Sequence, residues 1–419
     1  MQPVRGTKDI LPDDIGIWQQ IYDIAYRELS NYNYKEIRTP IIENTNLFER
    51  SIGNFTDIVN KEMYTFQDQG ARSITLRPEG TSSIARAVLN HKIHLKNKMN
   101  RLWYLGPMFR YERPQKGRQR QFHQLGIECL GSKEATSDTE VIKIAYNILN
   151  KLKCTDEFNL EINSIGSLEE RELYTKELTT YLEKYKNELD EDSKKRLNNN
   201  PLRILDSKNE NTQKILKEAP LLKNYLGKPS IEHFQELCEQ LSYLNIDYNI
   251  NNHLVRGLDY YNYTAFEINT NNQNQQNTIC GGGRYDYLTT QLGGPKIPAV
   301  GWAIGIERLI LIIKKSLEKE IISNLIYIVP DKLTNYNIIW NIINILEIYK
   351  LQFELDLSST NIKKKIRKAN QIGINMCIIL DEQTLKNKSL TIRWLHTGNK
   401  QIIKIANLQE YIKYVRNFF

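Results

Sequence analysis

The segment RLWYLGPMFRYERPQKGRQRQFHQLGIECLG, residues 101–131, decides the fold class. Its two halves alternate apolar and polar residues and flank the turn sequence PQKG. This pattern predicts two antiparallel strands joined by a hairpin with a polar, basic tip. Because side chains two positions apart on a strand share a face, Arg110 and Glu112 should point the same way, and so should Gln124 and Glu128.

The charges of this hairpin suggest three kinds of ligand. The four cations at its tip are too many to be neutralised locally, and they suit the phosphates of a polyanion: Arg113, Lys116, Arg118 and Arg120. Arg110 can present its guanidinium fork to a phosphate, or it can form a salt bridge with Glu112. Gln124 and Glu128 can together bind an ammonium group and a small ring that carries N–H donors. The segment therefore predicts contacts with a nucleoside triphosphate, a nucleic acid and a small amine.

The bulk composition narrows the class without identifying a function. A chain of 419 residues predicts two or three domains, and 40% hydrophobic with 25% charged residues is typical of globular proteins. The net charge of +8 permits a polyanionic partner, but on bulk charge alone a lysine-rich surface from a biased genome is the favoured explanation. The five cysteines include no CxxC, which argues against a zinc site or a disulfide scaffold and favours a reducing compartment. No signal peptide or membrane span is indicated, so we expect a cytoplasmic protein.

Outward from the hairpin, the pattern predicts an α+β fold in two domains. MYTFQD (63–68) and SITLRPE (73–79) alternate like antiparallel strands, and the helix that follows them has Thr81 or Ser82 as its expected N-cap. Residues 168–228 are highly charged with helical periodicity, which predicts a helical insertion. From residue 323, strands alternate with helices, as in a small α/β sheet. We therefore expect a core at 1–322, with a mixed, mainly antiparallel sheet flanked by helices, and an α/β domain at 323–419.

Two further stretches place polar residues where a ligand could contact them. In LRPEGT (76–81), Glu79 and Thr81 follow a strand, and Gly80 lets backbone approach a ligand, although PEG is often only a turn. In LVRGLDYY (254–261), Arg256 lies among apolar residues, so it needs an anion, and Asp259 is its candidate partner in a purely structural interpretation.

Glycines mark two more such stretches. CGGGRYDYL (280–288) has three consecutive glycines, which permit close backbone approach or form a strained hairpin. In GWAIGIERL (301–309), Gly305 and Arg308 are three residues apart at a helix start and should share one face of it.

In combination, order and spacing these motifs resemble the class II aminoacyl-tRNA synthetases, and within them the histidyl-tRNA synthetase family. RTPIIENTNLFERSIG (38–53) is similar to motif 1, GPMFRYERPQKGRQRQFHQLGIE (106–128) to motif 2 and AVGWAIGIERL (299–309) to motif 3. LVRGLDYY and CGGGRYD resemble the two segments peculiar to the histidine enzymes, and NPLRILDSK (200–208) resembles the bacterial insertion. The resemblance covers essentially the whole chain and implies a class II core followed by an anticodon-binding domain.

The resemblance implies a two-step reaction and a role for each motif residue. Histidine and ATP give histidyl-adenylate, and histidine is then transferred to the 3′ end of tRNA(His), with Mg²⁺ carried mainly on the triphosphate by ligands that the sequence does not identify. The implied catalytic residues are Arg110 and Arg256. The implied histidine-binding residues are Glu79, Thr81, Gln124, Glu128, Tyr260, Tyr261 and Tyr285. The implied ATP-binding residues are Arg110, Glu112, Arg256, Gly305 and Arg308, and the implied tRNA contacts are Arg113, Gln115 and Lys116. The motif 1 resemblance also implies a homodimer.

Three other interpretations stay open at this point. The first is a catalytically inactive regulatory paralogue of histidine biosynthesis, whose relatives lack the C-terminal domain and have degraded motif residues. The presence of Arg110, Arg256, Arg308 and the final α/β unit argues against it. The second is an RNA-binding module that keeps the fold without turnover, and the third is a generic ATP-dependent acid–amine ligase.

Overall fold

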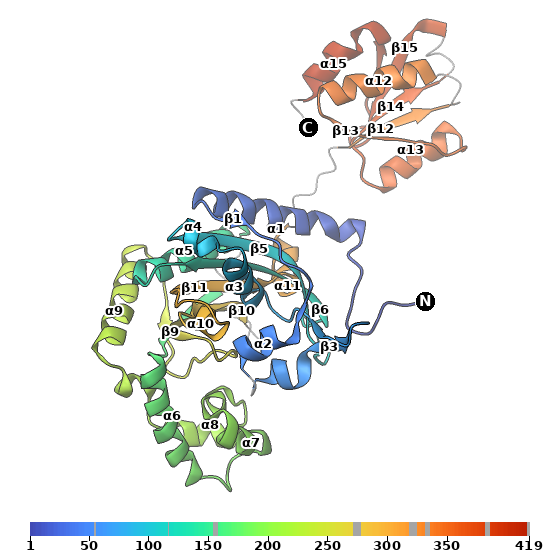
Figure 1. The fold of residues 1–419 in the computed structure, drawn as a ribbon. Helices are drawn as coiled ribbons and strands as arrows, with labels where there is room; N and C mark the ends of the chain where they lie inside the picture. The colour runs from blue at the N-terminus through green and yellow to red at the C-terminus, as the bar shows by residue number, and fades with distance from the viewer. Residues whose placement is uncertain are drawn as a thin grey trace. The chain divides into compact units, whose positions relative to one another are not determined.

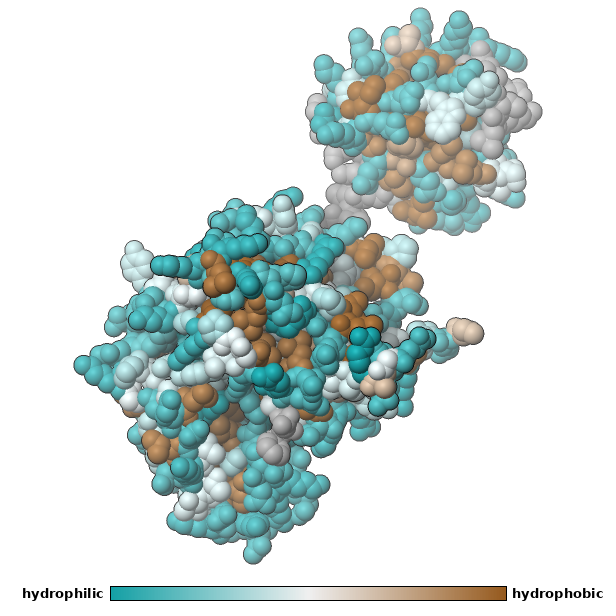
Figure 2. Space-filling view, viewed as in Figure 1, coloured by the Kyte–Doolittle hydropathy of each residue, from teal (hydrophilic) through white to brown (hydrophobic). Residues whose placement is uncertain are grey.

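The computed structural model describes residues 1–53, 56–115, 117–153, 158–270, 278–317, 325–331, 336–381 and 386–416. The chain divides into two compact units, Met1–Leu317 and Glu318–Phe419 (Figure 1). On the face drawn in Figure 2, the surface of the first unit is mainly hydrophilic. Among the helices of the described residues, none is both long enough and apolar enough to cross a membrane.

The first unit is built on one large mixed sheet. In the described residues it has eight strands in the order β1-β5-β6-β11-β10-β9-β7-β8. The inner pairings are antiparallel, while the edge pairs β1–β5 and β7–β8 are parallel, so the predicted mainly antiparallel sheet is confirmed. The strands are β1 (Lys35–Glu36), β5 (Asn100–Phe109), β6 (Gln121–Leu130), β7 (Phe158–Ser164), β8 (Asn249–Ile250), β9 (Asn262–Thr270), β10 (Thr278–Arg284) and β11 (Ala299–Gly305).

The predicted hairpin is the pair β5–β6. In its register Tyr104 lies opposite Gly126, and Gly106 lies opposite Gln124. On its other side β6 pairs with β11, where Gly301 lies opposite Glu128. The alternation of the strand therefore sets Gln124, Gly126 and Glu128 on one face of the sheet.

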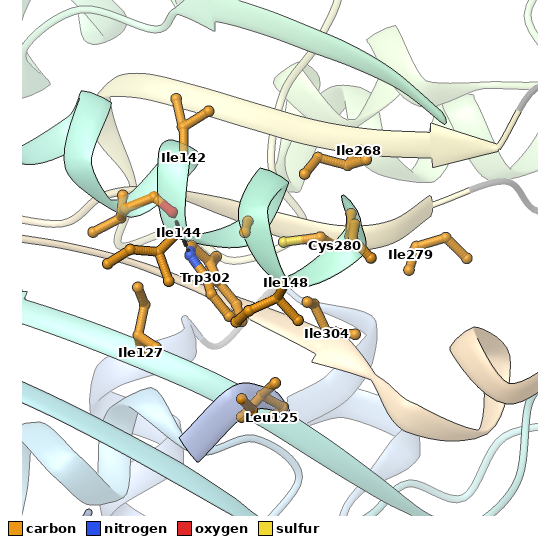
Figure 3. Packing of buried hydrophobic residues seen from close by; sticks show 14 of the residues in the cluster. Leu125, Ile127, Ile142, Ile144, Ile148, Ile268, Ile279, Cys280, Trp302 and Ile304 are labelled. Atoms are coloured by element: carbon orange, nitrogen blue, oxygen red, sulfur yellow. Dashed lines mark hydrogen bonds between the residues drawn. The ribbon is translucent and has the colours of Figure 1, made fainter. Parts of the chain in front are cut away.

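The opposite face of this sheet carries the main apolar core. Helices α1 (Pro12–Asn31), α5 (Ala135–Lys151), α9 (Lys228–Tyr243) and α11 (Ile306–Leu317) contribute buried residues to it. Trp302 of β11 lies at its centre, and its indole N–H donates to the carbonyl oxygen of Val141 at 2.7 Å (Figure 3). These helices close one face, so ligands have access only to the other.

A smaller three-stranded sheet, β2 (Ile42–Asn44), β4 (Ser73–Leu76) and β3 (Tyr64–Gln67), leads into α3 (Thr81–Asn90). The N-cap of α3 is Gly80, so the expectation of Thr81 or Ser82 as the cap is wrong. The Glu79 carboxylate instead accepts from the backbone N–H groups of Thr81 at 2.7 Å and Ser82 at 2.8 Å. A carboxylate satisfies the free N–H groups of a helix start and also favours the positive end of its dipole. The neighbouring helical elements are α2 (Thr45–Ile52), η1 (Ile58–Glu62), α4 (Ile93–Lys96) and α10 (Leu288–Gln291).

The charged segment after β7 forms helices, as its periodicity indicates. It contains α6 (Leu168–Glu183), α7 (Glu191–Asn199), η3 (Pro201–Asp206), α8 (Glu210–Lys217) and η4 (Leu222–Tyr225). Helix α6 starts at a capping box in which the Ser167 side chain accepts from the Glu170 backbone and Glu170 accepts from the Ser167 backbone. Buried residues such as Tyr174 and Leu178 join the apolar cluster on the ligand-accessible face of the sheet.

The second unit is an α/β sheet in the order β13-β12-β14-β15-β16, as counted in the described residues. Strands β13 (Gln352–Leu355), β12 (Leu325–Pro330) and β14 (Met376–Leu380) run parallel, which confirms the predicted crossover arrangement. Strands β15 (Ser389–Trp394) and β16 (Lys400–Lys404) continue it antiparallel. β16 was missed in the sequence because its side chains are almost all exposed and carry little apolar alternation. The described part of the second unit has two apolar clusters. Helices α12 (Tyr336–Ile348) and α15 (Leu408–Val415) contribute buried residues to one of them, and α13 (Ile362–Gln371) contributes to the other.

Candidate active site

The ligand-accessible face of the large sheet carries a cavity of about 970 Å³. It brings together predicted residues from four separate stretches of sequence. The predicted histidine-binding and ATP-binding residues that line it are Glu79, Thr81, Arg110, Glu112, Gln124, Arg256, Tyr260, Tyr261, Gly305 and Arg308. Two predicted histidine-binding residues, Glu128 and Tyr285, do not line the cavity and are buried.

Glu128 is a buried acid, with 1% of its surface exposed. One carboxylate oxygen accepts from the Thr81 hydroxyl at 2.7 Å, and the other accepts from the Tyr285 hydroxyl. A Cβ at Gly301, on the neighbouring strand, would overlap this carboxylate, so glycine there makes the room. Burial raises the pKa of Glu128 to about 8, against the opposing effect of its two hydroxyl partners. Near neutral pH the group is therefore mostly protonated and poised to exchange a proton with a ligand nitrogen.

Three tyrosines surround this acid. The ring centroids of Tyr260 and Tyr261 are 4.7 Å apart, and those of Tyr260 and Tyr285 are 5.6 Å apart. Burial raises the pKa of each phenol, so all three stay neutral and can act as hydrogen-bond donors. This end of the cavity is an aromatic pocket with one buried carboxyl group, which suits a small flat ring with two nitrogens.

Arg256 pairs with Glu267 of β9, so the suggested pairing with Asp259 is wrong. Glu267 lies opposite Gly281 in the sheet, and a side chain at Gly281 would overlap the Arg256 guanidinium. Burial opposes the charge, but the Glu267 carboxylate raises the pKa of Arg256 above its ordinary value. Arg256 is thus a fixed cation, and its buried Nε atom has no hydrogen-bond partner in the described residues.

Asp259 contacts other groups instead. Its carboxylate accepts from the Asn200 amide at 3.0 Å, and its backbone N–H donates to Ile52 at 3.1 Å. The sequence places Asp259 only three residues from Arg256, but only the fold brings Glu267 beside it.

Three more arginines cluster at the other end of the cavity. Arg110 donates to the Pro78 carbonyl at 2.9 Å and lies 4.0 Å from Glu112, while Arg118 lies closer to Glu112, at 3.1 Å. Arg308 donates to the Thr278 carbonyl, and burial together with the charges of Arg118 and Arg110 lowers its pKa. The mutual repulsion of these cations favours a bound anion.

The position of Gly305 differs from the one expected. Gly305 is the last residue of β11, and α11 begins after it, so Gly305 and Arg308 do not share a helix face. A Cβ added at Gly305 would meet no protein atom within 4 Å, because its open side faces the cavity.

The hairpin tip is divided, because Gly117, Arg118 and Gln119 line the cavity while other tip residues do not. Arg113 and Gln115 are exposed and do not line it, and Gln115 closes a tight turn with Arg118 through backbone hydrogen bonds of 3.1 and 2.9 Å. Lys116 lies outside the described residues. The two described residues are therefore free to contact a large ligand while the cavity is occupied.

Comparison with known proteins identifies the family. A family model described as histidyl-tRNA synthetase matches residues 6–309, and one described as an anticodon binding domain matches residues 328–414. The chain belongs to the histidyl-tRNA synthetase family. It is 57% identical over 420 residues to a chloroplastic histidine–tRNA ligase of Gracilaria tenuistipitata var. liui, covering 100% of this chain and 96% of that protein. It is 46% identical over 421 residues to the histidine–tRNA ligase of a Cyanothece species, and the match covers 97% of this chain and 95% of that protein.

A solved structure supports the same assignment. The crystal structure of apo histidyl-tRNA synthetase from S. aureus matches with a TM-score of 0.82 and 34% identity, covering 98% of this chain and 99% of that one. The fold class predicted from the motifs is thereby confirmed.

The helical insertion of this family member holds the loop that carries Arg256, a role not predicted from the sequence. Arg203 donates to the Gly257 carbonyl at 3.0 Å. Arg171 donates to the carbonyl oxygens of Tyr261 at 2.6 Å and Asp259 at 3.1 Å. Each acceptor is a backbone carbonyl, which every sequence supplies, so no sequence pattern marks these contacts.

Phe122 and Glu267 are two other cavity residues that the sequence analysis did not single out. The Arg110 guanidinium lies 5.2 Å from the centre of the Phe122 ring. Phe122 lies on a strand whose alternation was predicted, and extending that alternation from Gln124 to Phe122 would have found it.

Replacing Glu128 by glutamine should remove a pH dependence of stability. The folded pKa of about 8 lies above the ordinary 4.5, so ionisation costs free energy in the folded protein. Wild-type stability should fall relative to Glu128→Gln between about pH 4.5 and pH 8, by on the order of a few kcal/mol. Melting temperatures at pH 5.5 and pH 8.5 measure this, with exposed Glu172→Gln as the control. If the melting temperatures of wild type and Glu128→Gln differ by the same amount at both pH values, the pKa of Glu128 in the folded protein is ordinary.

Replacing Arg203 by alanine should loosen the loop at 254–261. The Gly257 carbonyl loses its donor, which costs roughly 1–3 kcal/mol of local stability. Hydrogen–deuterium exchange should accelerate about tenfold in peptides that cover the loop and stay unchanged in β5–β6. The control is Lys195→Ala, an exposed residue of α7. Unchanged exchange in the loop would mean that the insertion does not hold it.

Proposed function

We propose that this chain is a histidine–tRNA ligase, which activates L-histidine with ATP and transfers histidine to tRNA(His). The observation that carries the proposal is the cavity itself. It joins an aromatic pocket over a buried carboxyl group to a cluster of arginines, in a chain that is 57% identical to a named ligase over its full length. One end suits imidazole and the other suits a triphosphate.

The aromatic end would bind the amino acid. Glu79, Thr81 and Gln124 would take the α-ammonium group, and the buried Gln124 carbonyl oxygen has no other partner among the described residues. Glu128 and Tyr261 would read the two imidazole nitrogens, with Tyr260 and Tyr285 closing the pocket. A site that pairs both nitrogens strongly rejects amino acids that lack them, because its buried polar groups would be left unpaired.

The arginine end would bind ATP. Arg110 and Arg256 would flank the α-phosphate, while Glu112, Gly305 and Arg308 would contact the adenosine and the outer phosphates. A histidine carboxylate oxygen attacks the α-phosphorus, and the bond to the bridging oxygen breaks, releasing pyrophosphate. No enzyme nucleophile is required, so catalysis depends on alignment and on cations fixed in place before the reaction.

Mg²⁺ would arrive as part of the ATP substrate, where it neutralises phosphate charge. In the described residues no cluster of three or more His, Cys, Asp or Glu side chains is placed to hold a metal. The nearby carboxylates of Glu112 and Glu267 are already paired with Arg118 and Arg256. This donor set fits an ion held mainly by the triphosphate, with Arg256 supplying a fixed charge.

The tRNA would contact both units. Arg113, Gln115 and Lys116 at the hairpin tip would meet the acceptor end, and the domain at 323–419 would bind the anticodon, after a catalytic domain at 1–322. A homodimer is also proposed, through the segment that resembles motif 1. The exposed hydrophobic residues Ile41, Ile42 and Phe66 at the small sheet support it.

The regulatory paralogue is not favoured. The chain matches named ligases over its full length, including the C-terminal domain, and the arginines of the motifs are present. For the compartment we propose the cytoplasm, with the plastid as the second candidate, since the relative from Gracilaria is named chloroplastic.

ATP–pyrophosphate exchange with each of the twenty amino acids tests the function. We expect exchange with L-histidine alone, and then histidine transfer to tRNA(His) when the tRNA is added. Glu128→Gln should lower the histidine-dependent exchange by roughly 100-fold or more, because a site that pairs both imidazole nitrogens loses the carboxyl group that pairs with one of them. Exchange with several amino acids, or none from a folded chain, would contradict the proposal.

A further inference from the structure

Tyr104 is buried next to the proposed histidine site without lining the cavity, and no motif pointed to it. It lies on β5 directly opposite Gly126, on the face that carries Gln124 and Glu128. Only 5% of its surface is exposed. A Cβ at Gly126 would overlap the end of its ring, and a Cβ at Gly80 would overlap the same end. Two glycines therefore make the space that the phenol hydroxyl occupies.

The hydroxyl of Tyr104 is buried and makes no hydrogen bond of normal geometry among the described residues, although the Thr81 side chain lies near enough to oppose the rise of its pKa. A buried polar group without a partner costs roughly 1–3 kcal/mol, and phenylalanine would fill the same volume without that cost. Burial and then the charges of Glu128 and Glu79 raise the pKa of this phenol, so it is neutral at physiological pH. Packing alone gives no reason for a hydroxyl here.

Other unpartnered atoms lie in the same place. In the part of the chain that the structure describes, the Gln124 carbonyl oxygen and the Arg256 Nε atom are also buried without a partner, and both residues line the cavity. In the proposed function these two atoms meet the substrates. The Tyr104 hydroxyl shares their burial and their lack of a well-formed protein hydrogen bond, although Tyr104 does not itself line the cavity.

The position of the hydroxyl points to one end of the amino acid. Gly80, which it overlies, lies between Glu79 and Thr81, and Gln124 is two residues from Gly126 on the same face. Glu79, Thr81 and Gln124 form the proposed ammonium subsite. Thr81 and Tyr285 already donate to the two oxygens of Glu128 at the imidazole subsite, so no vacancy there requires another hydroxyl.

We propose that the Tyr104 hydroxyl is a further substrate contact, which accepts a hydrogen bond from the α-ammonium group of histidine. The proposal deepens the proposed function and rests on it. With Glu79 and Gln124, it gives the three N–H bonds of the ammonium group three oxygen acceptors. An amino acid that presents this group at a different depth would leave the hydroxyl unpaired, so Tyr104 also contributes to selectivity.

The test is Tyr104→Phe, measured by calorimetry with three ligands. L-Histidine and histamine carry the ammonium group, and 3-(imidazol-4-yl)propionate lacks it. We expect dissociation constants roughly tenfold higher for the first two, as for a lost hydrogen bond to a charged group, and within about twofold of wild type for the third. The melting temperature without ligand should be unchanged or higher. The control is Tyr174→Phe, a tyrosine of α6 that is 2% exposed and outside the cavity.

Two results would overturn the assignment of Tyr104. Equal weakening for all three ligands would place the hydroxyl at the imidazole or in the general packing of the pocket. Unchanged affinity for L-histidine would remove the contact altogether. A wild-type chain that binds none of the three ligands would instead contradict the proposed function, so the two failures are distinguishable.

Discussion

The structure of the site depends on the pairing of one partly buried cation, Arg256, with one partly buried carboxylate, Glu267. Burying either charge alone costs several kcal/mol, so each requires the other, and both require the open space over Gly281. That space exists because Gly281 has no side chain. The loop of Arg256 has little regular structure of its own and is held by Arg203 and Arg171 of the insertion. The cation is thus fixed before any ligand arrives.

A buried carboxyl group, that of Glu128, makes one end of the cavity chemically different from the other. Glycine at position 301 makes room for it, and the hydroxyl groups of Thr81 and Tyr285 partner it. The raised pKa of Glu128 keeps the acid protonated and therefore neutral. The raised pKa of Arg256 keeps the guanidinium protonated and therefore charged, so one end of the cavity holds a neutral acid and the other a permanent cation. A substrate with an imidazole at one end and a carboxylate directed at a phosphate matches this division.

Much of this arrangement could be predicted from the sequence, because strand alternation assigns faces directly. Alternation in residues 101–131 placed Gln124 and Glu128 together, and the motif order identified the family. The partner of Arg256 could not be predicted, since Glu267 reaches it through strand register and not through proximity in sequence. Arg203 and Arg171 donate to backbone carbonyls, which no sequence pattern marks. In the sequence Tyr104 is one tyrosine of a strand, and only the structure shows that its hydroxyl is buried without a well-formed hydrogen bond among the described residues.

The most direct test of the account is the rate of histidyl-adenylate formation in a single turnover by Arg256→Ala/Glu267→Gln. The second change avoids leaving Glu267 buried and unpaired. We expect the rate to fall by roughly 100-fold or more, as when a preorganised charge is removed from a transition state, while the dissociation constant for L-histidine stays within about threefold. A rate near that of the wild type would contradict the central claim that a fixed cation at position 256 stabilises the reacting phosphate.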